Sequence, residues 1–153
     1  MKRSGYWQVG TYLSIPLSDG SFGYGRVLSD PYLAFYDYRT AAPELDLDVI
    51  AARAVLFSLA VRKKGLEHWL ALGVQALTGA VAAPVVQFMQ SLADPRDCVI
   101  FDSAGVERPA TPEECIGLER AAVWEAAHIE QRLLDTFLGR PNATEQQMRV
   151  RLS

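Results

Sequence analysis

The first third of the chain contains the feature that most constrains the fold, a series of short apolar and aromatic stretches separated by turn residues. Residues 11–17 are rich in β-branched and apolar side chains and lead into Asp19-Gly20, a turn dipeptide in which glycine tolerates positive φ. Residues 22–28 and 32–38 follow, with an Asp-Pro turn between them. Three consecutive short strands predict an antiparallel meander, which forms a strongly twisted sheet or a small barrel.

The second of these strands has two very different faces. Alternation places aromatic residues and an arginine on one face, and Gly23, Gly25 and Val27 on the other. The glycines predict close packing against another part of the chain, or a bulge. Alternate residues of the third strand continue the tyrosine-rich face. That face is either a groove for a peptide or ligand or the surface on which the C-terminal helix packs. Its candidate partner-binding residues are Tyr24, Arg26, Tyr36 and Tyr38.

The middle of the chain predicts more strands. Residues 53–62 are apolar on both faces, which indicates a central strand, although a short apolar run also fits a helix. The other expected elements are a helical turn near 45–51, a hairpin partner at 69–72, and strands at 85–89, 98–101 and 106–108.

The last expected element is a helix with clear boundaries. Thr111 to Glu114 reads as a capping box, with proline at the first helical position. Apolar residues recur at helical spacing up to Phe137, and a Gly and a Pro follow. The predicted fold class is α+β: a bent, mainly antiparallel sheet, or an SH3-like barrel, with a long C-terminal helix packed on it. We expect a single domain over residues 1–141 and a polar, weakly docked C-terminal tail over 142–153.

Charge is distributed unevenly along the chain. Residues 1–65 carry eight Lys/Arg and six Asp/Glu, whereas the remainder carries seven and twelve. An acidic C-terminal half disfavours nucleic-acid binding, which needs a basic surface. The same half suits docking onto a basic protein surface, although an ordinary solvated surface also explains it.

Neither a membrane span nor a secretory signal is expected. Residues 69–89 contain no charged residue, but Gly, Gln, Thr and Pro interrupt them, so a buried soluble segment fits better than a membrane helix. No apolar stretch follows the positive charges Lys2 and Arg3. The two cysteines have no pair spacing, which suggests a reducing, cytoplasmic compartment; the alternative is a single disulfide between them.

The residues suited to catalysis are few. The histidines are His68 and His128, and neither they nor the cysteines have a metal-ligand spacing. Cys98 lies in an apolar strand pattern and is expected to be a small buried hydrophobe, whereas Cys115 lies near a helix start. A Cys–His nucleophilic pair is a remote alternative. We expect no cofactor, no metal and no enzymatic activity.

A second candidate surface surrounds the predicted helix. Trp, Tyr and Arg are favoured interface anchors, and charged side chains accompany a tryptophan here. The alternative is that Trp124 covers the edge of the core and His128 caps that contact. The candidate partner-binding residues of this surface are Glu119, Trp124, Glu125, His128 and Glu130.

The order and spacing of these motifs resemble the Immunity protein 26 family of bacterial polymorphic toxin systems. The likeness extends over roughly residues 10–140. It rests on Ile15-Pro16-Leu17, Gly25-Arg26-Val27-Leu28, Tyr36-Asp37, Trp69, Gly73, Glu114-Cys115, Gly117-Leu118-Glu119, Ala122-Val123-Trp124, His128-Ile129-Glu130 and Arg132-Leu133.

This resemblance implies a role and no catalytic residues. An immunity-protein-like chain stays in the producing cell, in the cytoplasm, and binds a cognate toxin so that the toxin cannot act there. The expected mechanism is stoichiometric occlusion by a monomer or weak homodimer, with no nucleic-acid or membrane partner. The alternatives are a small-ligand or peptide-binding barrel that uses the tyrosine-lined face and, more remotely, the Cys/His enzyme.

Overall fold

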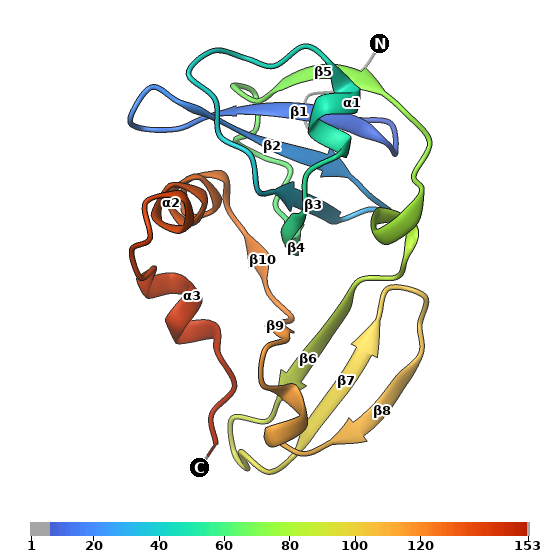
Figure 1. The fold of residues 1–153 in the computed structure, drawn as a ribbon. Coiled ribbons are helices and arrows are strands. Elements are labelled where there is room, and N and C mark those ends of the chain that lie inside the picture. Colours follow the sequence, from blue (N-terminus) through green and yellow to red (C-terminus); the bar gives the residue numbers. More distant parts are fainter. Residues whose placement is uncertain (1–6, 153) are drawn as a thin grey trace.

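The computed structural model describes residues 7–152, which form two sheets flanked by short helices (Figure 1). The larger sheet has the strand order β10-β4-β3-β2-β1-β5, and the smaller has the order β8-β7-β6-β9. The strands of the larger sheet are β1 (Thr11–Pro16), β2 (Phe22–Val27), β3 (Tyr32–Tyr36), β4 (Val55–Val61), β5 (Leu70–Val74) and β10 (Val123–Trp124). Those of the smaller sheet are β6 (Val86–Gln90), β7 (Cys98–Asp102), β8 (Glu107–Ala110) and β9 (Glu119–Arg120).

The predicted fold class is confirmed. Strand pairs are antiparallel except β10–β4 and β6–β9, which are parallel. Neither sheet closes into a barrel within residues 7–152, so the open-sheet version of the prediction describes the molecule. The helices are α1 (Leu47–Ala51), α2 (Ala126–Phe137) and α3 (Ala143–Met148), and single 3-10 turns lie at Gly79–Ala82 and Glu113–Cys115.

The predicted meander is formed by β1, β2 and β3, which pair antiparallel in sequence order. Its first turn needs glycine, because Gly20 has φ of +86°. The Asp19 carboxylate accepts a hydrogen bond from the Ser21 amide at 3.0 Å, and the Leu17 amide donates to the Ser21 carbonyl at 2.8 Å. The turn chemistry read from the sequence therefore sets the register of β1 against β2.

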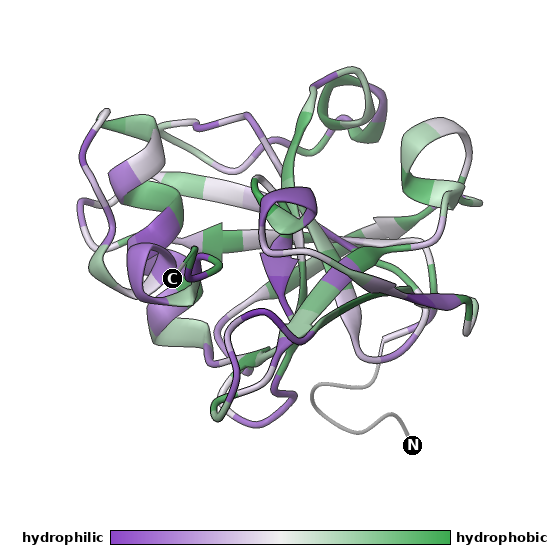
Figure 2. Ribbon diagram, turned by 90° about the horizontal axis from the view of Figure 1, so that it is seen from below, coloured by the Kyte–Doolittle hydropathy of each residue, from purple (hydrophilic) through white to green (hydrophobic). Residues whose placement is uncertain are grey.

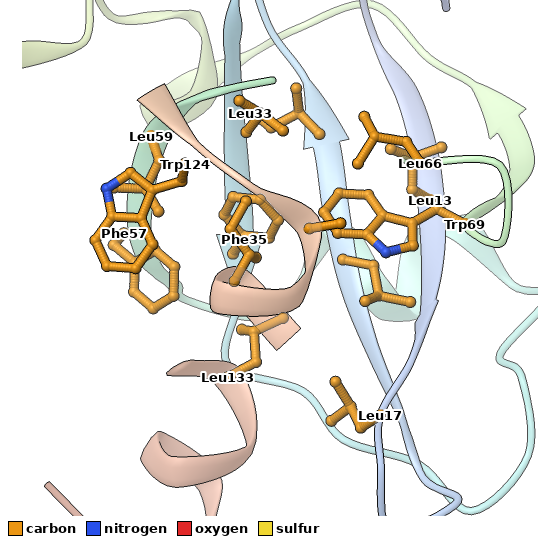
Figure 3. Packing of buried hydrophobic residues seen from close by; sticks show 14 of the residues in the cluster. Leu13, Leu17, Leu33, Phe35, Phe57, Leu59, Leu66, Trp69, Trp124 and Leu133 are labelled. Atoms are coloured by element: carbon orange, nitrogen blue, oxygen red, sulfur yellow. The ribbon is translucent and has the colours of Figure 1, made fainter. Parts of the chain in front are cut away.

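Helix α2 covers one face of the larger sheet, and the main core lies between them (Figures 1 and 3). The glycine face of β2 turns toward this helix. A Cβ placed on Gly23 would lie 3.3 Å from Leu133 Cδ1, so the expected close packing is real and is made against a helix side chain. The core residues labelled in Figure 3 are Leu13, Leu17, Leu33, Phe35, Phe57, Leu59, Leu66, Trp69, Trp124 and Leu133.

The strand at residues 70–74 pairs differently from the expected hairpin. β5 does not return along β4 but forms the opposite edge of the sheet, antiparallel to β1. The connection after β4 buries Leu66 and Trp69 in the core on the α2 side. Burial of these two side chains carries the chain across the sheet, so tertiary packing decides the pairing.

The expected long helix at 111–137 is wrong in its first half. The capping box forms, with the Thr111 amide donating to Glu114 Oε1 at 2.9 Å and the Glu114 amide donating to Thr111 Oγ1 at 3.3 Å. It precedes a single 3-10 turn, Glu113–Cys115, and Gly117, whose φ is +85°, follows two residues later. The following residues form β9 and β10, which pair with β6 and β4, and only α2 is helical. Sheet pairing overrides the helical spacing in this segment.

The C-terminal segment also contains more structure than expected. Asn142 caps α3 by accepting a hydrogen bond from the Glu145 amide at 2.9 Å, and carbonyls of Met148 and Arg149 accept hydrogen bonds from Arg120. The helical turns beside the C-terminus carry both polar and apolar residues (Figure 2). The domain division at residue 141 stays a prediction.

The uncharged stretch at 69–89 belongs to the body of the fold. It supplies β5, a 3-10 turn and most of β6. Over the part of the chain that the structure describes, no helix has the length and apolar character needed to cross a bilayer. The Lys2 and Arg3 region, where no secretory signal is expected, lies outside the described residues.

Candidate functional site

The structure divides the predicted partner-binding residues between two surfaces. Tyr24, Arg26 and Tyr36 lie on the face of the larger sheet that points away from α2, with Tyr38 just beyond the end of β3. The remaining residues lie on β9, on β10 and along α2. The first group forms what we call the tyrosine face, and the second forms the α2 surface.

The tyrosine face is built by strand alternation. Tyr12 on β1 lies directly opposite Arg26 on β2, so both side chains project from the same face. The guanidinium of Arg26 lies 3.9 Å from the Tyr12 ring centre, and the rings of Tyr12 and Tyr36 are stacked with centroids 6.3 Å apart. Tyr12 was missed by the sequence analysis, although the alternation of residues 11–17 and the turn at Asp19-Gly20 together place it here.

A polar network at the end of this face joins Tyr24 and Tyr38. The Tyr24 hydroxyl lies 2.5 Å from Thr40 Oγ1 and accepts a hydrogen bond from the Glu44 amide at 2.7 Å. The Tyr38 hydroxyl donates to Glu44 Oε1 at 2.7 Å. That hydrogen bond is the main reason that the pKa of Tyr38 is raised and the pKa of Glu44 is lowered. Tyr24 is therefore a buried structural link and Tyr38 is half-buried.

Between Tyr12, Arg26 and Tyr36 lies a cavity of about 190 Å³. Its other walls are the segment between α1 and β4, including Arg53, and the segment that follows β5, including Gln75. Sequence spacing gave no signal for Arg53 or Gln75, because the tertiary fold brings them to the sheet. One interpretation of this face from the sequence is a groove for a peptide or ligand, and the tyrosine-lined cavity is consistent with that interpretation.

On the α2 surface, Trp124 is turned inward. Only 3% of it is exposed, and it packs in the core with the guanidinium of Arg132 5.1 Å from its ring. Arg132 also binds the Glu119 carboxylate through two hydrogen bonds of 2.9 and 2.7 Å. Glu119 and Trp124 therefore hold β9 and β10 against α2.

Glu130 also serves the interior of the protein. Its Oε2 accepts a hydrogen bond from Nε1 of the buried Trp69 at 2.7 Å and another from His68 Nε2 at 2.5 Å. These contacts fasten the connection between β4 and β5 to α2. Truncating Glu130 would leave a buried donor without a partner.

Glu125 and His128 are the members of this group that face solvent. The Glu125 side chain is 59% exposed and lies 3.6 Å from Arg62, an exposed pair of the kind that contributes little to stability. His128 is exposed one turn along α2, and the apolar Val123 is exposed on β10, two residues before Glu125. We call these three exposed residues the outward side of the α2 surface.

The thiols are not arranged for nucleophilic catalysis. Cys98 and Cys115 are free and buried together in the core of the smaller sheet, with Phe88 and Ile100. Burial, followed by the neighbouring Cys98, raises the pKa of Cys115 to about 11, so this thiol stays protonated at neutral pH. The Cys98 thiol donates to the Pro95 carbonyl at 3.5 Å, and no hydrogen bond within residues 7–152 joins either thiol to His128. The described residues also contain no group of three or more His, Cys, Asp or Glu that could hold a metal ion.

The sequence of the chain matches a known protein family. Immunity protein 26 matches residues 8–99, which is more than half of the 153-residue chain. The chain belongs to the Immunity protein 26 family. The match runs from just before β1 into β7 and contains every residue named above for the tyrosine-face cavity. The α2 surface lies outside the matched segment.

No curated protein and no solved structure matches the chain. The candidate role of the chain therefore rests on the family match, and its candidate sites rest on the geometry of this chain. The resemblance seen in the sequence between Glu114 and Leu133 also lies beyond the matched residues.

Proposed function

We propose that this chain is an immunity protein that binds a cognate bacterial toxin and neutralises it by stoichiometric occlusion, without turnover. The observation that carries the proposal is the Immunity protein 26 match over residues 8–99. The burial of Cys115 and its raised pKa, which keeps the thiol protonated at neutral pH, support a role without covalent chemistry. The proposed setting is the cytoplasm of the producing cell, with the chain acting as a monomer or weak homodimer.

For the contact surface we propose the outward side of the α2 surface, centred on Glu125 and His128. An exposed apolar residue, Val123, comes two residues before Glu125 in the chain, and a mixture of apolar and charged residues is typical of protein interfaces. The acidic C-terminal half of the chain supports a toxin partner with a basic surface. Trp124, Glu119 and Glu130 support this surface from beneath.

The test is co-expression with the product of the neighbouring toxin gene. We expect a stable complex in pull-down and protection of cells that express the toxin. Glu125→Lys should raise the dissociation constant about tenfold, because it reverses an exposed charge at the proposed contact. Glu107→Lys is the matched control, since Glu107 is exposed on β8 in the smaller sheet.

Glu125, the N-cap residue of α2, and Glu130, within α2, have different effects on stability and are used differently in this assay. Glu125→Ala should change stability by less than about 0.5 kcal/mol, because its ion pair is exposed. Glu130→Ala should cost about 1–3 kcal/mol, because Trp69 Nε1 loses its acceptor. Absence of both binding and protection with the wild-type chain would remove the proposal.

A second candidate function is favoured by one observation. The tyrosine face contains a tyrosine-lined cavity of about 190 Å³, which is smaller than a typical pocket for a drug-sized ligand and suits a smaller group. This candidate is compatible with toxin binding, because the cavity lies on the sheet face opposite to α2.

A further inference from the structure

The cavity of the tyrosine face is lined by cationic groups and by no carboxylate. Arg26 and Arg53 contribute to its walls, and none of its described lining residues is Asp or Glu. Asp48 lies outside the lining and accepts a hydrogen bond from Gln75 Nε2 at 3.1 Å.

Arg26 is a buried charge that binds only neutral acceptors. It is 3% exposed, and it donates to the carbonyls of Gly10 at 2.8 Å, Gln75 at 2.9 Å and Ala76 at 3.3 Å, and to the Tyr36 hydroxyl at 3.2 Å. No carboxylate lies within 4.0 Å of it among residues 7–152. A guanidinium has five N–H groups, so these four bonds leave at least one donor.

A buried cation without a counter-ion is costly, and the carbonyl dipoles around Arg26 offset only part of that cost. An anion bound in the cavity would offset the rest of the cost of burying the Arg26 charge. The Tyr36 hydroxyl accepts from Arg26, and no hydrogen bond within the described chain uses its own proton. It is therefore a second donor beside the guanidinium.

Arg53 adds a second positive charge at the rim. Its guanidinium lies 4.2 Å from the Tyr38 ring centre, and the residue is exposed. The nearby Glu44 carboxylate already accepts hydrogen bonds from the Tyr38 hydroxyl at 2.7 Å and from the Asp46 amide at 3.3 Å. Arg53 forms no salt bridge within residues 7–152, although its charge contributes to the lowered pKa of Glu44. Its exposed side chain can turn toward a ligand in the cavity.

We propose that this cavity binds a carboxylate group, held by Arg26 and the Tyr36 hydroxyl inside and by Arg53 at the rim. Small apolar side chains complete the wall, among them Ala54 and Val81, and suit a short aliphatic stem behind the carboxylate. The volume of about 190 Å³ fits a group of the size of an acidic side chain or a short-chain carboxylic acid. Both sources present the same chemistry to the site.

This proposal gives the second candidate function a ligand class. It does not depend on toxin neutralisation, because its test uses the purified chain alone. The experiment is a ¹H–¹⁵N NMR titration that follows the Arg26 Nε–Hε signal. One arm uses butyrate and the other uses a blocked Gly-Glu-Gly peptide, with inorganic phosphate and blocked Gly-Gln-Gly as comparison ligands.

We expect saturable shifts at Arg26 with butyrate, with the Glu peptide, or with both. Butyrate alone assigns the site to free acids, and the peptide alone assigns it to an acidic side chain of a partner. Arg53→Gln should raise the dissociation constant about three- to tenfold, and Tyr36→Phe about threefold, because each removes one charged or polar contact. The same spectra show whether each variant is folded.

Arg62→Gln is the matched control, because Arg62 is an exposed arginine paired with Glu125 beside α2. It should leave the dissociation constant unchanged. The proposal is overturned if neither carboxylate gives saturable shifts at concentrations above the millimolar range. Equal binding of the Gln peptide or of phosphate, or an equal loss of affinity in Arg62→Gln and Arg53→Gln, would also overturn it.

Discussion

The contact between Leu133 and Gly23 offers a sharp test of how α2 packs on the larger sheet. Leu133 is fully buried on α2 and faces the strand position that has no side chain. Leu133→Ala removes three carbons, a transfer cost of about 2.4 kcal/mol at about 0.8 kcal/mol per buried methylene. The space left behind adds to this, so we expect a loss of about 3–4 kcal/mol in the free energy of unfolding.

Gly23→Ala should behave differently in the two backgrounds. In the wild-type chain, alanine reduces the conformational freedom of the unfolded state, which should stabilise the protein by about 0.4–1 kcal/mol. Crowding offsets this stabilisation, because the new methyl would lie 3.3 Å from Leu133 Cδ1. In the Leu133→Ala background the crowding is absent and the methyl enters the vacated space. There the same substitution should recover about 1 kcal/mol.

The assay is urea unfolding of the four chains of this cycle, followed by tryptophan fluorescence, because Trp69 and Trp124 lie in the same core. Leu92→Ala is the control, since Leu92 is 91% exposed and should change stability by less than about 0.5 kcal/mol. The reasoning is refuted if Leu133→Ala costs less than about 1 kcal/mol. Additivity of the two substitutions to within about 0.3 kcal/mol would refute it as well.

Two further predictions concern titratable groups. Burial acts to raise the pKa of Asp135, but hydrogen bonds from Asn142, Gln131 and Arg140 outweigh it and leave that pKa below its ordinary value. A lowered folded-state pKa contributes stability that is complete above the unfolded-state pKa and is lost as pH falls through the folded-state pKa. The wild-type chain should therefore lose stability below about pH 4, and Asp135→Asn should lose less over the same range. Urea unfolding at a series of pH values measures the free energy of unfolding of both chains. An equal dependence of that free energy on pH in the two chains would contradict this. Since burial, with Cys98, raises the pKa of Cys115 to about 11, the native chain at neutral pH should resist iodoacetamide, whereas the urea-unfolded chain should take up two adducts by mass spectrometry. Rapid labelling of the native chain would show that the thiols are accessible.

Local chemistry made the meander predictable, because Asp19 and Gly20 determine both the turn and the register of the strands beside it. The same reasoning failed at Thr111 and Glu114, where the capping box forms but caps a single turn. A helical pattern in the sequence reflects only the local preferences of the residues that form it. Residues 119–124 instead gain hydrogen bonds from two strands that are distant in the sequence, and no local pattern records those partners.

The candidate sites likewise combine features that local sequence patterns predict with features that depend on the tertiary fold. Tyr24, Arg26 and Tyr36 were predicted to share a face, because alternation along a strand is a local property. Their burial followed from α1 and from the segment after β5, which cover that face. Likewise, Trp124 and Glu130 were recognised as notable residues, but the partners Arg132 and Trp69 that turn them inward depend on the tertiary fold.

The short segment of β9 and β10 has a consequence for how the chain is made. It supplies an edge strand to each sheet, since β9 pairs with β6 and β10 pairs with β4. During synthesis on the ribosome, β4 and β6 therefore lack a neighbour on one side until residues 119–124 have left the exit tunnel. A nascent or truncated chain that stops before residue 119 lacks both of these edge strands at once, so the two sheets gain their last strands in the same late step.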